Sequence, residues 1–247
     1  MGSHMPGHVL DYFERIYVIN LRSRPDRKRD LMREFTAIGF SAQNVRWFEA
    51  IKPDDRGPFM SIGVRGCFLS HLGILKLAEA EAVGSVLILE DDVSFVNGFS
   101  ERLTGVVETL QSGDWDVFYG GGGTERQHPV APGLALVEPQ DGVGCAHFIA
   151  LRGSAIGPVR QYIAAQLARP HGDPAGGPMP VDGSYSWARR ALGLRTLIAA
   201  PELCFQRSSR SDITPRAWDR IGGLRNLATL WRNVKQRLDL GARKRIV

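Results

Sequence analysis

The stretch Ser85-Val-Leu-Ile-Leu-Glu-Asp-Asp92 joins a short apolar run directly to three consecutive acidic side chains. A continuous apolar run of this length predicts a strand that is covered on both faces, as in a parallel sheet flanked by helices. Residues Gly66 to Val83 precede it and are apolar over much of a predicted helix, which Gly84 ends. After it, a second helical stripe is formed by Phe99, Leu103, Val106 and Leu110. The centre of the fold is therefore predicted to be helix, buried strand, helix.

Strand and helix patterns alternate along the rest of the chain. β-branched and aromatic residues predict further strands at Arg15–Leu21, Val45–Ile51, Val117–Tyr119, His147–Leu151 and Thr196–Ala199. Further helices are predicted after the capping pattern Ser23-x-x-Asp26, near Ile156–Leu167 and around Ser184–Leu192, with a Gly/Pro-rich loop at Arg169–Pro180. This order predicts an α/β fold with a mostly parallel open twisted sheet flanked by helices, and a less regular C-terminal part.

Ligands of open α/β sheets bind beyond the carboxyl ends of the strands. That rule points to Asn20–Arg27, Glu49–Lys52, Glu90–Asp92 and the glycine run Gly120–Gly123. The glycine run lacks the spacing of a nucleotide fingerprint, so a turn is the favoured interpretation, with close approach of a substrate as the alternative.

The acidic triplet Glu90-Asp91-Asp92 admits two interpretations. Three carboxylates at the end of a buried strand repel one another, and a hard divalent cation bound to a diphosphate would relieve that repulsion. Alternatively, the triplet is a solvated turn whose acids precede the next helix. Spacing alone leaves these two interpretations open.

Composition narrows the class of protein. The chain has 247 residues, is 43% hydrophobic and carries a formal net charge of +5, which suits one sizeable core and an anionic partner. The basic clusters lack a recognised nucleic-acid-binding motif, so no nucleic-acid partner is expected. The three separated cysteines, Cys67, Cys145 and Cys204, predict reduced thiols used in packing. Residues 1–5 have the character of an expression-tag scar, and no apolar run is long enough to span a bilayer. A cytoplasmic protein is expected.

The C-terminal segment, residues 215–247, has apolar residues at helical spacing among many basic ones. Such a segment packs on the core or lies on an anionic membrane, and the membrane interpretation is favoured here. The protein would then be peripheral on the inner face of the cell membrane.

Three blocks of sequence resemble glycosyltransferase family 25, the lipopolysaccharide and collagen galactosyltransferase group. Ile19-Asn20-Leu21 with Arg24 and Arg27 resembles its opening region, Gly66-Cys67-x-x-Ser70-His71 its Gly-Cys-x-x-Ser-His block, and Leu89-Glu90-Asp91-Asp92 its Leu-Glu-Asp-Asp block. The resemblance is weaker around Gln206 and Ser209. It implies a GT-A-like fold in residues 6–214, with a nucleotide-binding half at about 11–125 and an acceptor half at about 126–214.

The resemblance also implies a function and a set of site residues. The implied reaction moves a hexose from UDP-galactose or UDP-glucose to a glycan or lipid-linked glycan, as in lipopolysaccharide synthesis, with inversion and with Mn²⁺ or Mg²⁺. Asp92 would bind the metal. The residues expected on the donor side are Asn20, Arg24, Arg27, Glu49, Ala50, Ser70, His71, Glu90, Asp91 and Gln206. For His71, contact with a phosphate and a structural role with Ser70 are both considered, and the structural role is slightly favoured.

Asp182 opens a predicted helix after the Gly/Pro loop and is either its N-cap or the general base that takes the acceptor's proton. Tyr185 and Trp187 could stack on a sugar. The family's Thr-His-Ala-Tyr stands here as Cys145-Ala146-His147-Phe148, so the histidine is displaced by one residue. Two rival functions remain: a sugar-phosphate nucleotidyltransferase, disfavoured because Asn20–Arg29 contains no glycine, and a non-catalytic binding module of the same fold.

Overall fold

The computed structural model describes residues 7–207. Its helices are the 3-10 turn η1 (Val9–Tyr12), α1 (Pro25–Ala37), α2 (Ile62–Ala80), α3 (Phe99–Ser112), α4 (Gly153–Gln166) and α5 (Val181–Leu192). Its strands are β1 (Arg15–Asn20), β2 (Val45–Glu49), β3 (Ser85–Glu90), β4 (Val93–Phe95), β5 (Val117–Tyr119), β6 (His128–Ala131), β7 (Leu134–Val137), β8 (Phe148–Arg152), β9 (Thr196–Ala199) and β10 (Cys204–Gln206).

The main sheet has eight strands in the order β2-β1-β3-β8-β5-β9-β7-β6. The pairs β1–β2, β1–β3 and β5–β9 are parallel, whereas β8 is antiparallel to both of its neighbours and β7 is antiparallel to β9 and β6. Among the described strands of this sheet, only β7 and β8 therefore run against the others. The predicted α/β architecture with a mostly parallel sheet is confirmed.

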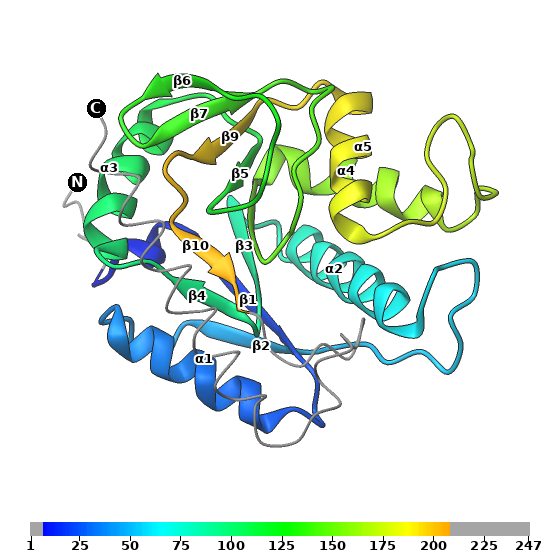
Figure 1. The fold of residues 1–247 in the computed structure, drawn as a ribbon, viewed down its shortest axis with the longest axis horizontal. Helices are drawn as coiled ribbons and strands as arrows, with labels where there is room; N and C mark the ends of the chain where they lie inside the picture. Colours follow the sequence, from blue (N-terminus) through cyan, green and yellow to red (C-terminus); the bar gives the residue numbers. More distant parts are fainter. Residues whose placement is uncertain (1–6, 208–247) are drawn as a thin grey trace.

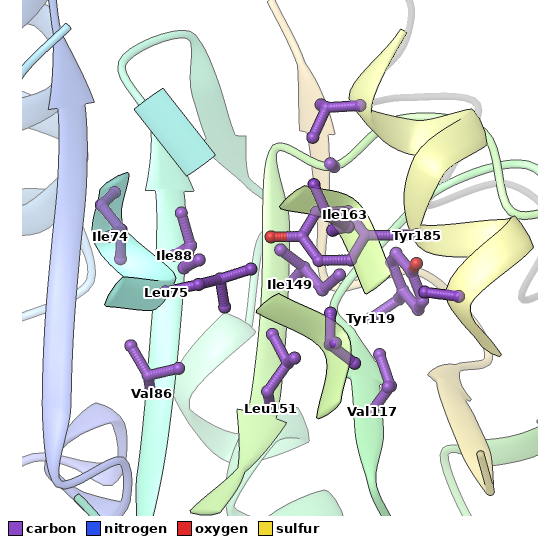
Figure 2. Close-up of a cluster of buried hydrophobic side chains, with 14 of the residues drawn as sticks. Ile74, Leu75, Val86, Ile88, Val117, Tyr119, Ile149, Leu151, Ile163 and Tyr185 are labelled. Carbon is purple, nitrogen blue, oxygen red and sulfur yellow. The ribbon is translucent and has the colours of Figure 1, made fainter. Parts of the chain in front are cut away.

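Helices cover both faces of the sheet (Figure 1). On one face α2, α4 and α5 enclose a buried cluster, and Figure 2 shows its centre, where Ile88 and Ile149 of the sheet meet Ile163 and Tyr185 of the helices. On the other face α1, α3 and η1 enclose a second cluster that is rich in aromatic rings, including Phe35, Phe99 and Phe118. Val86 and Leu87 are both fully buried although their side chains point to opposite faces, as the quoted apolar run predicts.

Local sequence explains the start and end of the helices near the site. Pro25 is the first residue of α1, where its missing N–H costs nothing, and Gly39 follows the helix with a φ of 75°. The predicted cap by Ser23 is wrong, because Arg24 holds the cap position without a side-chain hydrogen bond. Helix α2 starts earlier than predicted because the Ser61 side chain accepts a hydrogen bond from Val64 N.

Two small pairings were missing from the sequence prediction. Strands β6 and β7 form a hairpin at the sheet edge. Strands β4 and β10 form a separate two-stranded antiparallel sheet, in which Gln206 lies opposite Val93. Because Val93 directly follows the acidic triplet, this second pairing delivers Gln206 to the predicted site.

Within residues 7–207, each helix is too short or too polar to cross a membrane. The predicted amphipathic segment at 215–247 lies outside the described residues, as do the expression-tag residues.

Candidate active site

A cavity of about 580 Å³ lies at the carboxyl ends of β1, β2 and β3, beside the starts of α1 and α2. This is the edge at which the strand-end rule places ligands. Seven residues expected at the site line the cavity, namely Arg24, Arg27, Ala50, Glu90, Asp91, Asp92 and Gln206. The acidic triplet thus lines a cavity, and the interpretation as a solvated turn fails because Asp91 and Asp92 are only 6% and 7% exposed.

Asp91 is held by β1 and α1. The Asn20 side-chain amide donates to its Oδ2 at 2.7 Å, and Arg27 Nη1 donates to its Oδ1 at 2.9 Å. Burial raises the pKa of the Asp91 carboxyl, and the Arg27 charge and the Asn20 hydrogen bond oppose that rise. Asn20 is absent from the cavity wall and also donates to the Arg24 carbonyl at 3.1 Å. Asn20 therefore positions the wall, while its predicted donor contact stays a prediction.

Asp92 is the carboxylate of the triplet whose negative charge is least compensated by its neighbours. Its Oδ2 accepts from Gln206 Nε2 at 3.2 Å and lies 3.6 Å from Arg27 Nη1, but its buried Oδ1 has no hydrogen-bond partner among residues 7–207. Burial, reinforced by the Glu90 charge, raises the pKa of Asp92 to about 7. A buried carboxylate oxygen without a donor needs a proton or a cation, so Asp92 fits the predicted metal ligand.

Glu90 points to the opposite side of the triplet, toward α2. Its Oε1 lies 3.4 Å from His71 Nε2 and 3.7 Å from Cys67 Sγ. Burial raises the pKa of Glu90, but the neighbouring His71, His147 and Cys67 together outweigh burial, so this pKa lies below its usual value. On the far side of the imidazole, His71 Nδ1 lies 3.2 Å from the hydroxyl of Tyr185.

Ser70 and His71 are fully buried behind the cavity wall. The Ser70 hydroxyl accepts from Ile51 N at 2.8 Å and donates to the Gly66 carbonyl at 2.7 Å, so it ties the loop after β2 to α2. This placement agrees with the structural role considered for both residues. Glu49 is exposed at the end of β2 and is absent from the wall, so its predicted donor contact has no support from the cavity.

Asp182 lies on the first turn of α5 and is absent from the cavity wall, and Pro180, not Asp182, is the N-cap of this helix. Its Oδ2 accepts from Cys145 N at 3.3 Å and its Oδ1 from Gly183 N at 2.8 Å. Cys145 has a φ of 68°, and its thiol donates a long hydrogen bond of 3.9 Å to Gln206 Oε1. Desolvation, followed by the charges of Asp182, Glu90 and Asp92, raises the pKa of Cys145 to about 11. Cys145 therefore lies between the acidic triplet and Asp182.

Several expectations need correction. Cys145 is exposed rather than packed, although all three cysteines are free thiols. Tyr185 is 1% exposed within the core and cannot stack on a sugar (Figure 2). Trp187 is half-buried, close against Gly176 of the preceding loop.

The run Gly120–Gly123 is a close-packed turn. A methyl group on Gly120 would come within 2.6 Å of the Phe148 ring, and one on Gly121 within 2.2 Å of the Cys204 carbonyl. These contacts explain Gly120 and Gly121 by packing, whereas a methyl group on Gly123 would have no heavy atom within 4 Å.

Two residues of the site were absent from the sequence prediction. Cys67 lines the cavity beside Glu90. Arg207 fastens the acidic turn, since its N–H donates to the Asp92 carbonyl and its Nη2 to the Asp91 carbonyl, each at 2.7 Å. The signal for Arg207 was its place directly after Gln206.

Comparison with known proteins finds a family model that matches part of the chain. The model of glycosyltransferase family 25 (LPS biosynthesis protein) matches residues 53–128. A glycosyltransferase 25 family member of Aedes aegypti is 34% identical over 125 residues, covering 43% of this chain and 21% of the relative. Procollagen galactosyltransferase 1 of Danio rerio is 31% identical over 127 residues, with coverage of 43% and 21%.

A third relative, the inactive glycosyltransferase 25 family member 3 of Homo sapiens, is 30% identical over 127 residues, with coverage of 43% and 21%. The chain thus spans about a fifth of the length of these curated relatives. Among solved structures, a glycosyltransferase involved in glycosylation of the major capsid of PBCV-1 is 12% identical with a TM-score of 0.47, covering 79% of this chain and 93% of that one. These relatives bear the names of glycosyltransferase family 25 members, and each matches less than half of this chain. The predicted resemblance to glycosyltransferase family 25 is confirmed, with the family match covering residues 53–128.

Proposed function

We propose that this protein transfers a hexose from a nucleotide-diphosphate sugar to a hydroxyl group of a glycan acceptor. One observation carries the proposal: three carboxylates end a buried strand inside a cavity of about 580 Å³ whose wall also carries Arg24 and Arg27. A cavity of this size suits a small-molecule ligand, and its mixture of acidic and basic groups suits a metal–diphosphate.

The residues present fit a hard divalent cation, Mn²⁺ or Mg²⁺. The buried Asp92 Oδ1 lacks a partner in the described part of the chain, and carboxylate oxygen is the ligand that these ions prefer. Asp92 would hold the ion. When bound, the ion would offset negative charge on the departing diphosphate.

Two arginines and one aspartate of the chain would bind the diphosphate and accept the acceptor's proton. Arg24 and Arg27 line the wall where the diphosphate would lie, and Arg27 also holds Asp91. Asp182 is a carboxylate on the opposite side of Cys145, which suits the general base that takes the proton of the acceptor hydroxyl. Attack from that side would displace the diphosphate with inversion.

The sugar, acceptor and location are proposed from the relatives and the sequence. The name procollagen galactosyltransferase of one relative favours UDP-galactose, with UDP-glucose as the second candidate donor. The description of the family as LPS biosynthesis proteins favours a lipid-linked glycan acceptor made at the cytoplasmic side of the membrane. The basic amphipathic segment 215–247 would bring the enzyme to that surface.

Calorimetry of the full chain against UDP, GDP and ADP, each with and without Mn²⁺, tests the proposal. We expect metal-dependent binding that is tightest for UDP. Asp92→Asn should weaken it by at least about 100-fold, because a charged ligand to the ion is lost. The matched control is Asp30→Asn on α1, which removes a carboxylate paired with Arg33 outside the cavity. If no nucleotide binds in a metal-dependent manner, the proposal is wrong.

One relative bears the name of an inactive family member, which favours a non-catalytic nucleotide-sugar-binding protein as the second candidate. The assay that separates the two is slow hydrolysis of the donor without an acceptor. An enzyme releases free sugar at a rate that Asp182→Asn lowers, whereas a binder releases none.

A further inference from the structure

A second group of potential metal ligands lies behind the acidic triplet. Cys67 and His71 are four residues apart on α2, so they lie on one face of the helix, and Glu90 ends the neighbouring strand β3. One ligand atom from each lies within 4.8 Å of the other two. The imidazole Nε2 is 3.4 Å and the thiol Sγ is 3.7 Å from Glu90 Oε1.

Two of these separations are close to those around a tetrahedral zinc ion. Zinc lies about 2.3 Å from sulfur and about 2.0–2.2 Å from nitrogen or oxygen, so at tetrahedral angles its ligands are about 3.3–3.6 Å apart. The N–O and S–O distances of the group are close to this range. The three atoms would close on an ion with small side-chain movements.

The surroundings of His71 support a ligand role. The side chain is fully buried, and its Nε2, which faces Glu90, has no hydrogen-bond partner of acceptable geometry among the described residues. Its Nδ1 lies 3.2 Å from the Tyr185 hydroxyl. If this hydroxyl accepts the proton of Nδ1–H, the lone pair of Nε2 is free to bind a metal, which is the usual arrangement for histidine ligands.

An ion could reach the group, because Cys67 and Glu90 both line the 580 Å³ cavity. We propose that Cys67, His71 and Glu90 bind one zinc ion, whose fourth coordination position faces this cavity. Thiolate and imidazole select zinc over Mn²⁺ and Mg²⁺, whereas Asp92 offers only oxygen. Binding converts the Cys67 thiol to a thiolate and releases one proton to solvent.

Cobalt(II) substitution in the full chain, freed of metal by a chelator, tests this site directly. We expect one equivalent of Co²⁺ to give tetrahedral visible absorption and a thiolate-to-cobalt charge-transfer band, and Zn²⁺ to abolish both. Cys67→Ser should remove the charge-transfer band and lower the affinity at least about 100-fold. The control Cys145→Ser removes an exposed cysteine outside the proposed ligand group and should leave the spectrum unchanged.

Asp92→Asn separates this site from the proposed transferase function. It should abolish metal-dependent UDP binding and retain the cobalt–thiolate band. If Cys67→Ser does not fold, alkylation of Cys67 in the Cys145→Ser protein decides the matter, since bound Zn²⁺ should slow it at least tenfold. An absent thiolate band, or a band that persists in folded Cys67→Ser, would overturn the proposal, as would equal alkylation rates with and without Zn²⁺.

Discussion

Replacing Gly121 with alanine should damage both stability and the site, although Gly121 touches no expected ligand. The added methyl group would lie 2.2 Å from the Cys204 carbonyl oxygen, so the backbone must move by about 1 Å to restore an ordinary contact. Overpacking of this kind costs about 1–3 kcal/mol, and the lower entropy of the unfolded alanine chain returns about 0.4–1 kcal/mol. We expect a net loss of about 1–2 kcal/mol, which lowers Tm by roughly 2–8 °C in a domain of this size.

The same displacement should reach the acidic turn. Cys204 begins β10, and that strand and the residue after it carry Gln206 and Arg207, which bind Asp92 and the backbone of the triplet. Gly121→Ala should therefore also weaken Mn²⁺-dependent UDP binding in calorimetry.

Gly123→Ala is the matched control, because a methyl group there has no heavy atom within 4 Å. Its Tm and its UDP affinity should equal or slightly exceed those of the wild type. The prediction is wrong if Gly121→Ala melts at the wild-type temperature, or if both variants lose the same stability. Either result would mean that the close packing of β10 against Gly121 does not require glycine at this position.

Three further predictions concern the base, a buried cation and a buried histidine. Asp182→Asn should lower kcat for transfer at least about 100-fold while Mn²⁺-dependent UDP affinity changes less than about twofold, and an equal loss in both would remove the base role. Arg189 is fully buried and donates to Thr196 Oγ1 at 2.6 Å and to the carbonyls of Asp141 and Glu138 at 3.3 Å. Arg189→Met should therefore lower the free energy of unfolding, measured in urea, by about 2–4 kcal/mol. The exposed control Arg190→Met should lower it by less than about 0.5 kcal/mol. Burial lowers the pKa of His147, so below pH 6.5 the unfolded chain binds a proton that the folded chain does not, and stability falls as the pH falls. His147→Phe should therefore lose less stability than the wild type between pH 7 and pH 5.5. Parallel losses in the two proteins would contradict this.

Long periodic or continuous apolar segments were predictable from the sequence, and short paired segments were not. The buried run before Glu90 and the helix containing Cys67 were found because burial of a whole face leaves a repeated pattern. Strands β4 and β10 have three residues each, and unlike the equally short β5 (Val117–Tyr119) they lie in a small sheet of their own in which they pair only with each other. The β6–β7 hairpin left one usable signal, the Pro132-Gly133 turn.

The site was predictable to the extent that it lies after strands. Arg24, Arg27 and Ala50 follow β1 and β2, and all three reach the cavity, as the strand-end rule requires. Cys67 and Arg207 were missed for a different reason: their roles depend on which side of α2 faces Glu90 and on the pairing of β10. Neither residue type nor spacing contains the orientation of α2, and the sequence hint for Arg207 was only its position directly after Gln206.

Strand direction explains how the residues before β8 reach the acidic triplet. Strand β8 lies between β3 and β5 but runs against both, with Phe148 opposite Leu89. Its amino end therefore lies at the edge where its neighbours have their carboxyl ends, and the residues before β8 reach the acidic triplet, as the hydrogen bond from Glu90 N to the His147 carbonyl shows. Cys145 comes to the same edge and donates its N–H to Asp182. A rule that searches only the carboxyl ends of strands examines Arg152 and passes over Cys145, although the reversal of one strand is what brings Cys145, hydrogen-bonded to both Asp182 and Gln206, to the edge that carries the acidic triplet.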